Sequence, residues 1–469
     1  MNILIVIIQV IAGIAACLVA LLSIPLFLPF RWPAAIMWGL KIYISALSVW
    51  LGLIGAMSAI AGLTTGSVFI SVVGTYAVLA YLLHLISVTR PPGPAGNFEQ
   101  AFGSQWENNL SPDQKKHFLT GRRLLKLPSV AHSQFVQNIP FATIPVTGRT
   151  LLCDLWQPSV NMKPSGLAFI YMHGSAFYFL DKDYNTRTLF SYLAAQGHVV
   201  MDVAYRLAPE TDIMGMVHDV KRAIFWLKGN AGNYRINPNK IIVGGASSGG
   251  HLALMAAYTA NDPQFTPIEL QGKDGSVCAV ISLYGPTDLE ALYYHTNQHL
   301  TTRPIPGQPK KSVPSKMPAM MKKNLGDDYY RLGMNKDFEK IGTLAPLLGG
   351  HPDECPEAYA LLSPLNHVHP GCPPTLLIHG EHDIMAPVGT TRLMFKRWLE
   401  KQVPAVLHIL PQTDHAFDLI LPKISPAAHN AIYDIERFMG LMATTQTSVI
   451  PVKPNPAVSV KESQAANLV

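Results

Sequence analysis

A serine flanked by glycines follows a short apolar run in the middle of the chain. Residues 241–243 (Ile-Ile-Val) lead into Gly-Gly-Ala-Ser-Ser-Gly-Gly at 244–250, and a helix-like segment follows. A Gly-x-Ser-x-Gly turn between a strand and a helix is typical of a nucleophilic serine, because the turn strains the serine backbone and admits only small neighbours. The complete pattern is centred on Ser247 and a relaxed one on Ser248. Since glycine occupies both flanking positions of the complete pattern, we predict Ser247 as the nucleophile.

A nucleophilic serine needs a base, and the base needs a carboxylate that orients it. Two further apolar runs, 374–378 and 405–409, are each followed by polar residues at the point where a strand would end. The first leads to Asp383 and the second to His415, which gives the order Ser, acid, His that is common when the serine lies on such a turn. We predict Asp383 as the acid and His415 as the base. Two competing acids, which we expect to face solvent or to cap a turn, are Glu381 and Asp414.

A third apolar run ends in the small residues of His173-Gly174-Ser175-Ala176. Such a turn can aim backbone N–H groups at one point, as an oxyanion hole requires. We predict that the N–H groups of Gly174 and Ser175, together with that of Ser248, stabilise a tetrahedral oxyanion. The other histidines form no cluster with the spacing of metal ligands, so we expect structural roles for them and predict neither a metal nor a cofactor.

These motifs lie in a stretch where strand-like and helix-like runs alternate. Several of the strand-like runs are continuously apolar, as expected for strands covered on both faces. We therefore predict an α/β fold with a mostly parallel central sheet covered by helices, in a catalytic domain at 150–441. The expected strands are 151–155, 166–172, 198–204, 240–243, 278–283, 374–378 and 405–409, and the expected helices are 186–196, 215–229, 249–260, 390–402 and 427–441.

Taken together, the motifs resemble the α/β-hydrolase fold and, within it, the hormone-sensitive-lipase-like esterases. The resemblance covers about residues 150–440 and is most specific in Tyr-Arg-Leu-Ala-Pro-Glu at 205–210, which precedes Asp219 and Trp226. It implies hydrolysis of carboxylic esters without a cofactor, with Ser247, Asp383 and His415 in the roles given above. It also implies bracing roles for four scaffold residues, namely Tyr205, Arg206, Glu210 and Asp219.

The chain departs from the family pattern at two places. The family usually has His-Gly-Gly-Gly where this chain has Ser175 and Ala176, and a positive φ there would strain a residue other than glycine. The family often has Asp and Ala around the nucleophile, where this chain has Ala246 and Ser248. Three alternatives stay open: an isoprenylcysteine-methylesterase-like enzyme, an amide hydrolase with the same triad, and a non-catalytic binding protein on a hydrolase fold.

The first 90 residues have a different composition, with only three charged residues, Arg31, Lys41 and Arg90, and no Asp or Glu. Residues 1–30 and 42–89 carry no charge, and a membrane-spanning helix needs about 20 apolar residues. We predict three transmembrane helices, near 4–28, 42–62 and 67–88, with a break near 62–66. The alternatives are a signal peptide for the first stretch and a buried helical hairpin for the second.

The distribution of basic residues predicts the orientation in the membrane. The loop after the first span contains Arg31 and Lys41, and five basic residues follow Arg90 between 115 and 126. By the positive-inside rule both segments face the cytoplasm, so we expect a multi-pass membrane protein with a cytoplasmic catalytic domain. Five sparse cysteines are consistent with a reducing compartment. The expected partners are a lipid bilayer and a small-molecule or lipid ester.

The remaining segments are less regular. Residues 91–149 begin with a Pro- and Gly-rich linker and continue as an expected cap-like region of helix and loop up to 145. A Pro-, Lys- and Met-rich insertion at 290–360 is either a lid or a solvated loop, and 442–469 is expected to be a disordered tail. The whole chain has 36 basic and 30 acidic residues, and residues 91–469 have 33 and 30, so nothing indicates nucleic acid as a partner.

Overall fold

The computed structural model describes residues 3–29, 34–299 and 344–445. Within them, one sheet has the strand order β1-β2-β4-β3-β5-β6-β7-β8, and β3 to β8 are parallel. β1 and β2 extend this sheet as an antiparallel edge. The strands are β1 (Gln134–Thr143), β2 (Thr150–Gln157), β3 (Ala168–Met172), β4 (Val199–Val203), β5 (Ile241–Ala246), β6 (Ala279–Leu283), β7 (Thr375–Gly380) and β8 (Ala405–Leu410).

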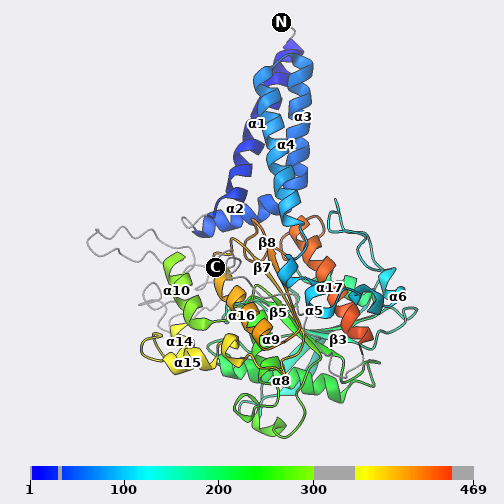
Figure 1. Ribbon diagram of the computed structural model, residues 1–469, viewed down its shortest axis with the longest axis vertical. Helices are drawn as coiled ribbons and strands as arrows, with labels where there is room; N and C mark the ends of the chain where they lie inside the picture. The colour runs from blue at the N-terminus through cyan, green and yellow to red at the C-terminus, as the bar shows by residue number, and fades with distance from the viewer. Residues whose placement is uncertain (1–2, 30–33, 300–343, 446–469) are drawn as a thin grey trace.

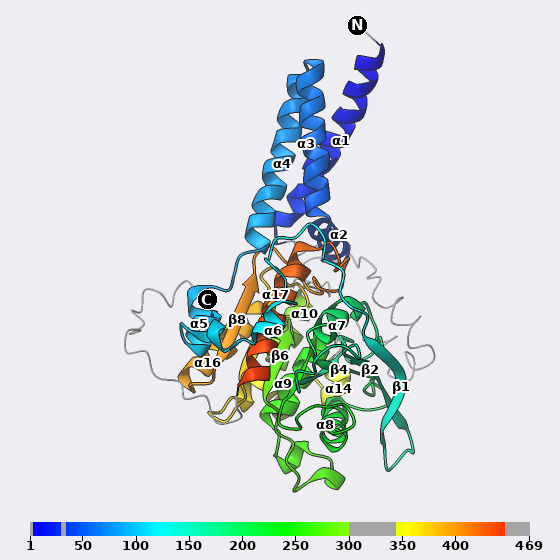
Figure 2. The ribbon, with the colours of Figure 1, turned by 90° about the vertical axis from the view of Figure 1, so that its right-hand side faces the viewer.

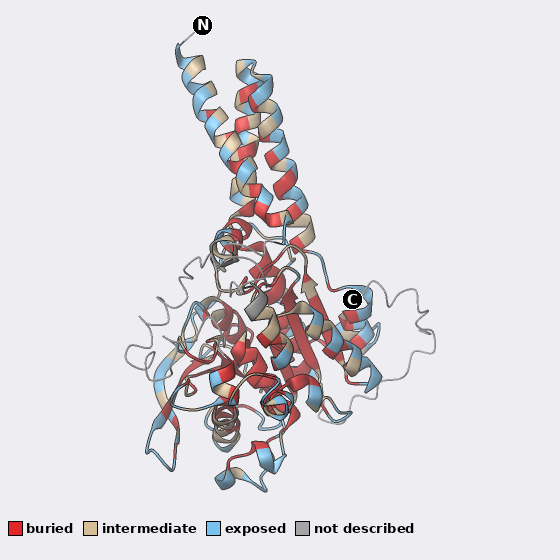
Figure 3. Ribbon diagram, turned by 90° about the vertical axis from the view of Figure 1, so that its left-hand side faces the viewer, coloured by how far each residue is buried: buried red, intermediate tan, exposed pale blue. Residues whose placement is uncertain are grey.

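Helices cover both faces of the sheet, so its central strands are buried throughout (Figure 3). One hydrophobic cluster joins the sheet to α8 (Ile213–Gly229), α9 (Ser248–Tyr258) and α16 (Val388–Glu400). The cluster on the other face includes α5 (Phe98–Phe102), α7 (Arg187–Ala194) and α17 (Pro426–Thr444), as Figures 1 and 2 show. The predicted α/β fold with a mostly parallel sheet is therefore confirmed.

The strand β1 lies in a segment that we expected to be helix and loop, so that prediction was wrong and the sheet begins before residue 150. β1 is an edge strand whose side chains are mostly exposed, and it therefore lacks a continuous apolar run. Its pairing with β2 is interrupted by register shifts around Asn138, which has φ 57°, and around Pro140. Proline is confined to edges and bulges in sheets, which fits this position.

Three apolar helices stand away from the part of the chain that contains the sheet in Figure 1. They are α1 (Ile3–Phe27), α3 (Ser48–Thr65) and α4 (Val68–Val88), and each is long and apolar enough to cross a membrane. The N-terminus lies at the far end of the bundle from the sheet, as expected for an odd number of spans. The second span differs from the prediction, because residues 34–46 form a separate helix, α2 (Ala34–Ala46), which lies across the base of the bundle.

The α3–α4 hairpin packs closely at small residues. A Cβ at Gly62 would lie 2.5 Å from the Ser71 amide nitrogen, and one at Gly74 would lie 2.6 Å from that of Ala59. Small residues let two apolar helices approach closely where water provides no hydrophobic driving force. The hairpin turns at Gly66, whose φ is 73°, within the predicted break at 62–66.

Short elements connect the larger ones. The insertion that we expected at 290–360 contains α14 (Ala345–Leu348) and overlaps α10 (Leu289–His299) and α15 (Pro356–Leu361) at its two ends, and its residues 300–343 lie outside the described part of the chain. We expected a disordered tail at 442–469, but α17 continues to Thr444, and residues 446–469 lie outside the described part. The short helices and turns are η1 (Pro94–Gly96), η2 (Trp106–Asn109), α6 (Pro112–Lys115), η3 (Pro263–Phe265), η4 (Ile268–Leu270), α10 (Leu289–His299), α14 (Ala345–Leu348), α15 (Pro356–Leu361) and η5 (Pro364–His367).

Candidate active site

Ser247 lies at the sharp turn between β5 and α9, with φ 53° and ψ −124°. A residue other than glycine adopts such a backbone conformation only where its surroundings enforce it. The neighbouring glycines explain how the turn fits: a Cβ at Gly245 or Gly249 would lie 2.3 or 2.1 Å from the carbonyl oxygen of Met172. The sheet therefore fixes the serine by contact with the backbone of β3.

The structure brings the three predicted triad residues together in one chain of hydrogen bonds. Ser247 Oγ lies 2.9 Å from His415 Nε2, and His415 Nδ1 lies 2.7 Å from Asp383 Oδ2. Ser247 is half-buried, whereas Asp383 and His415 are buried. All three follow strand ends at the carboxyl edge of the parallel sheet, where open α/β sheets place their sites. With Nδ1 protonated, His415 donates to Asp383 and can accept the serine proton at Nε2.

The Asp383 carboxylate accepts hydrogen bonds from backbone amides as well as from His415. Its Oδ1 accepts hydrogen bonds of 2.8 Å from the amides of Met385 and Ala386. Burial alone would raise the pKa of Asp383, but the charge of His415 and hydrogen bonds from His379 and His415 hold it well below the usual range. This carboxyl is therefore ionised throughout the neutral range.

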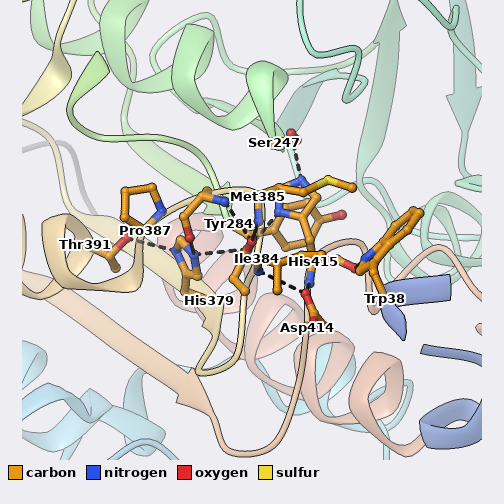
Figure 4. A network of polar contacts seen from close by, with 12 residues as sticks. Trp38, Ser247, Tyr284, His379, Ile384, Met385, Pro387, Thr391, Asp414 and His415 are labelled. Carbon is orange, nitrogen blue, oxygen red and sulfur yellow. Dashed lines mark hydrogen bonds and ion pairs between the residues drawn. The ribbon is translucent and has the colours of Figure 1, made fainter. Parts of the chain in front are cut away.

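His379 is a contact of the acid that sequence reasoning missed (Figure 4). It is fully buried at the end of β7, with Nε2 3.2 Å from Asp383 Oδ2 and Nδ1 2.9 Å from Thr391 Oγ1. We expected only a structural role because no metal-like cluster surrounds it. Its position at the end of a strand, four residues before Asp383, could have indicated this contact from the sequence.

The two competing acids do not contact the base imidazole. Glu381 is exposed and its carboxylate lies 3.4 Å from the amide of Gln412. Asp414 is buried, which corrects our expectation that it faces solvent, although it does accept hydrogen bonds from the amides of Ile384 and His415 as a turn cap. Burial and the nearby Asp383 raise the pKa of Asp414 to about 6, while Lys41 opposes this shift.

The turn after β3 lies directly beside the serine. Met172 pairs with Gly245 in the sheet, and a Cβ at Gly174 would lie 3.2 Å from that of Ser247. The amide of Ser175 donates to Ser248 Oγ at 2.8 Å. This predicted oxyanion donor is thus occupied by a hydroxyl, which must turn away before the amide can bind an oxyanion. The positive φ that we anticipated falls on Ala176 and Phe177, at 45° and 71°, and not on Ser175.

Three of the four expected scaffold residues brace this turn or its neighbours. The Tyr205 hydroxyl donates to the carbonyl oxygen of His173 at 2.8 Å, and the two rings stack. Burial lowers the pKa of His173 to about 4, so its ring is neutral. Arg206 makes two hydrogen bonds of 2.8 Å with the buried Asp219 carboxylate. The fourth, Glu210, is exposed and only approaches Arg149 at 3.5 Å, so a bracing role for it was wrong.

The described residues contain no group of three or more His, Cys, Asp or Glu side chains that could hold a metal ion. A groove of about 1030 Å³ is present, but it lies at the opposite, amino edge of the sheet. Residues that precede β5, β6, β7 and β8 line it, including Lys240, Ser276, Pro374 and Pro404. The groove is therefore remote from Ser247 and belongs to a different surface.

Comparisons with known proteins agree with this architecture. The BD-FAE family matches residues 153–325 and the prolyl oligopeptidase family matches residues 334–439. The sheet order, the turn at Ser247 and these two matches define the chain as an α/β hydrolase. Its motifs at 205–210 and around Ser247 resemble those of the hormone-sensitive-lipase-like esterases.

Two similar curated proteins come from Mycobacterium tuberculosis. The probable carboxylic ester hydrolase LipM is 28% identical over 67% of this chain and 63% of its own length. The esterase LipC is 30% identical over 59% of this chain and 60% of its own length. The chain thus spans less than two thirds of either relative.

Among solved structures, a truncated carbohydrate esterase from gut microbiota is 20% identical, with a TM-score of 0.47 over 68% of this chain and all of that one. Esterase 2 of Thermogutta terrifontis, with propionate bound, is 18% identical, with a TM-score of 0.47 over 66% of this chain and 96% of that one.

Proposed function

We propose that the chain is a membrane-anchored serine esterase that cleaves carboxylic esters through an acyl-enzyme intermediate. The observation that carries this proposal is the unbroken hydrogen-bond chain from Ser247 through His415 to Asp383. The names of the esterase relatives support the same reaction class.

In the first step Ser247 Oγ attacks the ester carbonyl carbon while His415 Nε2 takes the serine proton. Asp383 keeps Nδ1 protonated and stabilises the imidazolium that forms. His415 then gives the proton to the leaving alkoxide, which departs as the alcohol and leaves an acyl group on Ser247. A water molecule, deprotonated by His415, attacks this acyl group and releases the carboxylic acid together with the free serine.

The tetrahedral oxyanion of both steps needs hydrogen-bond donors. The amides of Gly174, Ser175 and Ser248 lie at the turn beside Ser247, and the helix α9 begins there with its positive dipole end. Removing one such donor typically lowers turnover about 10²–10³-fold. The Ser175 amide contributes once the Ser248 hydroxyl has turned away from it.

The anchor favours an apolar ester that partitions into a membrane. The carboxyl edge of the sheet, which holds the triad, lies on the side of the molecule that faces α2 and the apolar bundle (Figure 1). An ester held in the bilayer therefore lies on the same side as Ser247. With the orientation inferred from the basic residues, this side is the cytoplasmic surface of the membrane.

The test uses the detergent-solubilised full chain, a fluorophosphonate probe and nitrophenyl esters of increasing acyl length. Ser247→Ala should abolish labelling and lower kcat at least about 10⁴-fold, because the covalent step is lost. Ser276→Ala, an exposed serine at the opposite edge, is the control and should keep both activities. Retained hydrolysis in the Ser247→Ala variant would contradict the proposal.

The two nearby carboxylates give a second, independent comparison. Asp383→Asn should lower kcat about 10⁴-fold, because the base then takes the wrong tautomer. Glu381→Gln should stay within a few-fold of the wild type, since Glu381 is exposed and does not contact His415. The reverse ranking would show that the acid has been misassigned.

Amide hydrolysis is the second candidate, favoured by the match of residues 334–439 to the prolyl oligopeptidase family. The same triad cleaves both bonds, so geometry alone does not separate them. Matched ester and amide substrates with one acyl group, together with an isoprenylcysteine methyl ester, distinguish the alternatives by their kcat/KM values. Ligand binding without turnover of any substrate would favour a binding protein.

A further inference from the structure

The helix α2 contacts the loop that carries the base. The indole Nε1 of Trp38 donates a hydrogen bond of 3.0 Å to the backbone carbonyl of His415, as Figure 4 shows. Trp38 is half-buried, and α2 lies between the apolar bundle and the catalytic domain (Figure 1). A side chain from the membrane segment is thus bonded to the backbone of the predicted catalytic base.

Lys41, one turn further along α2, reaches the neighbours of both the acid and the base. Its Nζ lies 2.7 Å from His382 Nδ1 and 4.0 Å from Asp414 Oδ2. His382 immediately precedes Asp383, and Asp414 immediately precedes His415. Lys41 is only 2% exposed, and a buried ammonium is stable only when it is paired and hydrogen-bonded. One buried cation therefore ties together the two loops that carry the triad partners of Ser247.

The charges around Lys41 are consistent with these contacts. Burial lowers the pKa of Lys41 to about 8, and the nearby Asp414 and Glu381 oppose this shift. Burial and Lys41 lower the pKa of His382 to about 4, so its neutral ring accepts the hydrogen bond from the ammonium.

A third contact comes from the end of α4 that meets the catalytic domain. His84 Nδ1 lies 3.0 Å from Gln412 Oε1, and His84 Nε2 lies 3.0 Å from Ser45 Oγ of α2. Gln412 lies in the loop that carries the predicted base, two residues after the end of β8. We use the name seam for these contacts of Trp38, Lys41 and His84 with the loops after β7 and β8.

The loop after β8 contains two residues with an unfavourable backbone conformation. Gln412 and Ala416, on either side of the base, have positive φ values of 56° and 61°. Such conformations persist in residues other than glycine only where the surroundings over-determine them. The imidazole must stay within hydrogen-bond reach of both Ser247 and Asp383, and a misplacement of about 1 Å can lower a rate about 10²-fold.

We propose that α2 and the end of α4 belong to the hydrolase site as positioning elements, with Lys41 and Trp38 holding the loops that carry Asp383 and His415. The proposal rests on the proposed function for its effect on rate. It makes the membrane segment a part of the catalytic machinery as well as an anchor. Lys41 and Trp38 are positioning residues, since they act through the loops and do not touch the reacting atoms.

The kinetic test uses the full chain in detergent or nanodiscs with a soluble nitrophenyl ester, so that membrane delivery of the substrate plays no part. Lys41→Met should lower kcat about 10- to 100-fold with KM changed less than about twofold. Lys41→Arg, which restores the charge, should recover most of the rate, and Trp38→Phe should lower kcat less. The control is Tyr43→Phe, on the exposed side of α2.

Hydrogen exchange provides a measurement that does not depend on turnover. In a Ser247→Ala background, Lys41→Met should increase amide exchange in 381–387 and 411–418 and leave α9 unchanged. If the wild type neither hydrolyses esters nor reacts with the probe, the proposed function fails. The exchange measurement then still tests whether the seam holds the loops after β7 and β8 in place.

Unchanged kcat and unchanged exchange in a folded Lys41→Met variant would overturn the inference. If Lys41→Met does not fold, Trp38→Phe provides the test, because it keeps an aromatic, though smaller, side chain and removes the N–H donor. A twofold or smaller effect on both readouts in that variant then rejects the seam as a positioning element.

Discussion

The turn that carries Ser247 and the loops that carry Asp383 and His415 lie at the same edge of the sheet, but the side-chain contacts from α2 and α4 are made to the loops. The serine turn is fixed by backbone atoms of neighbouring strands, which leave no space for a Cβ at Gly245 or Gly249. The two loops are joined to each other by a backbone hydrogen bond of 2.9 Å from the His382 amide to the Thr413 carbonyl. They are further held by side-chain hydrogen bonds and charges, several of which come from α2 and α4.

This difference indicates which part of the site can be regulated or disturbed. Steric contacts with a buried sheet persist as long as the sheet is folded. Polar contacts with a separate helical segment persist only while that segment stays docked, and they depend on charge. We therefore expect the nucleophile to be robust and the acid and base to be sensitive to their surroundings.

The largest expected effect comes from adding a methyl group to the serine turn. In Gly249→Ala the new Cβ would lie 2.1 Å from the carbonyl oxygen of Met172, so the turn and β3 must separate. We expect loss of probe labelling and of turnover, with a destabilisation of at least about 3 kcal/mol. Thermal unfolding and labelling measure both.

The matched control for this change is Gly229→Ala. Gly229 ends α8, and a Cβ there meets no atom within 4 Å. We expect unchanged labelling and a stability equal to or slightly above that of the wild type. Full activity in Gly249→Ala would mean that the turn is not sterically fixed. The serine turn would then not differ from the two loops in the way described above.

A smaller effect is expected from the contacts behind the acid. His379→Phe keeps a ring but removes both nitrogens, so Asp383 loses one partner and keeps the amides of Met385 and Ala386. We expect kcat to fall about tenfold, which corresponds to about 1.4 kcal/mol, with little change in KM. Steady-state kinetics with a nitrophenyl ester measures the effect.

Substitutions at two adjacent threonines test the contact between His379 and Asp383 with a smaller structural change. Thr391→Val removes the hydrogen bond to His379 and should lower kcat about two- to threefold, whereas Thr390→Val removes only a bond to the Pro387 carbonyl. Equal rates in the two variants would show that the buried histidine does not position the acid.

The smallest expected effect concerns the pH dependence of stability. The folded-state pKa of Asp383 lies below its ordinary value, so the carboxylate contributes stability that is complete above about pH 4 and is lost as the pH falls further. We expect the unfolding temperature to fall less steeply below pH 4 in Asp383→Asn than in the wild type. Asp353→Asn, whose side chain is 79% exposed, is the control. Parallel curves for wild type and Asp383→Asn would contradict the assignment.

The sequence was sufficient for the parts of the site that are encoded locally. The strand before Ser247, the glycines around it and the helix after it are contiguous, so one motif predicts the turn. The positions of Asp383 and His415 beside Ser247 could be predicted because each lies a few residues after the end of an apolar strand. All predicted parallel strands are present, since buried strands are continuously apolar.

The features that were missed depend on contacts between distant segments or on exposed strands. We treated Lys41 as a loop cation of the positive-inside rule, and it is instead a buried residue of α2 that faces His382 and Asp414. No periodicity near residue 41 reports a partner more than 300 positions away. β1 was missed for a different reason, because an exposed edge strand that contains Pro140 has no distinctive apolar pattern.

The hydrogen bond between Trp38 and His415 joins residues 377 positions apart, so it also sets an order of events during synthesis. Domains generally fold from the N-terminus as the chain emerges, and α1 to α4 leave the ribosome long before β8. The strand that brings the base is among the last to be added, and it docks against helices that are already in place. We therefore expect the proposed esterase site to be complete only after β8 and the loop that follows it have docked against α2.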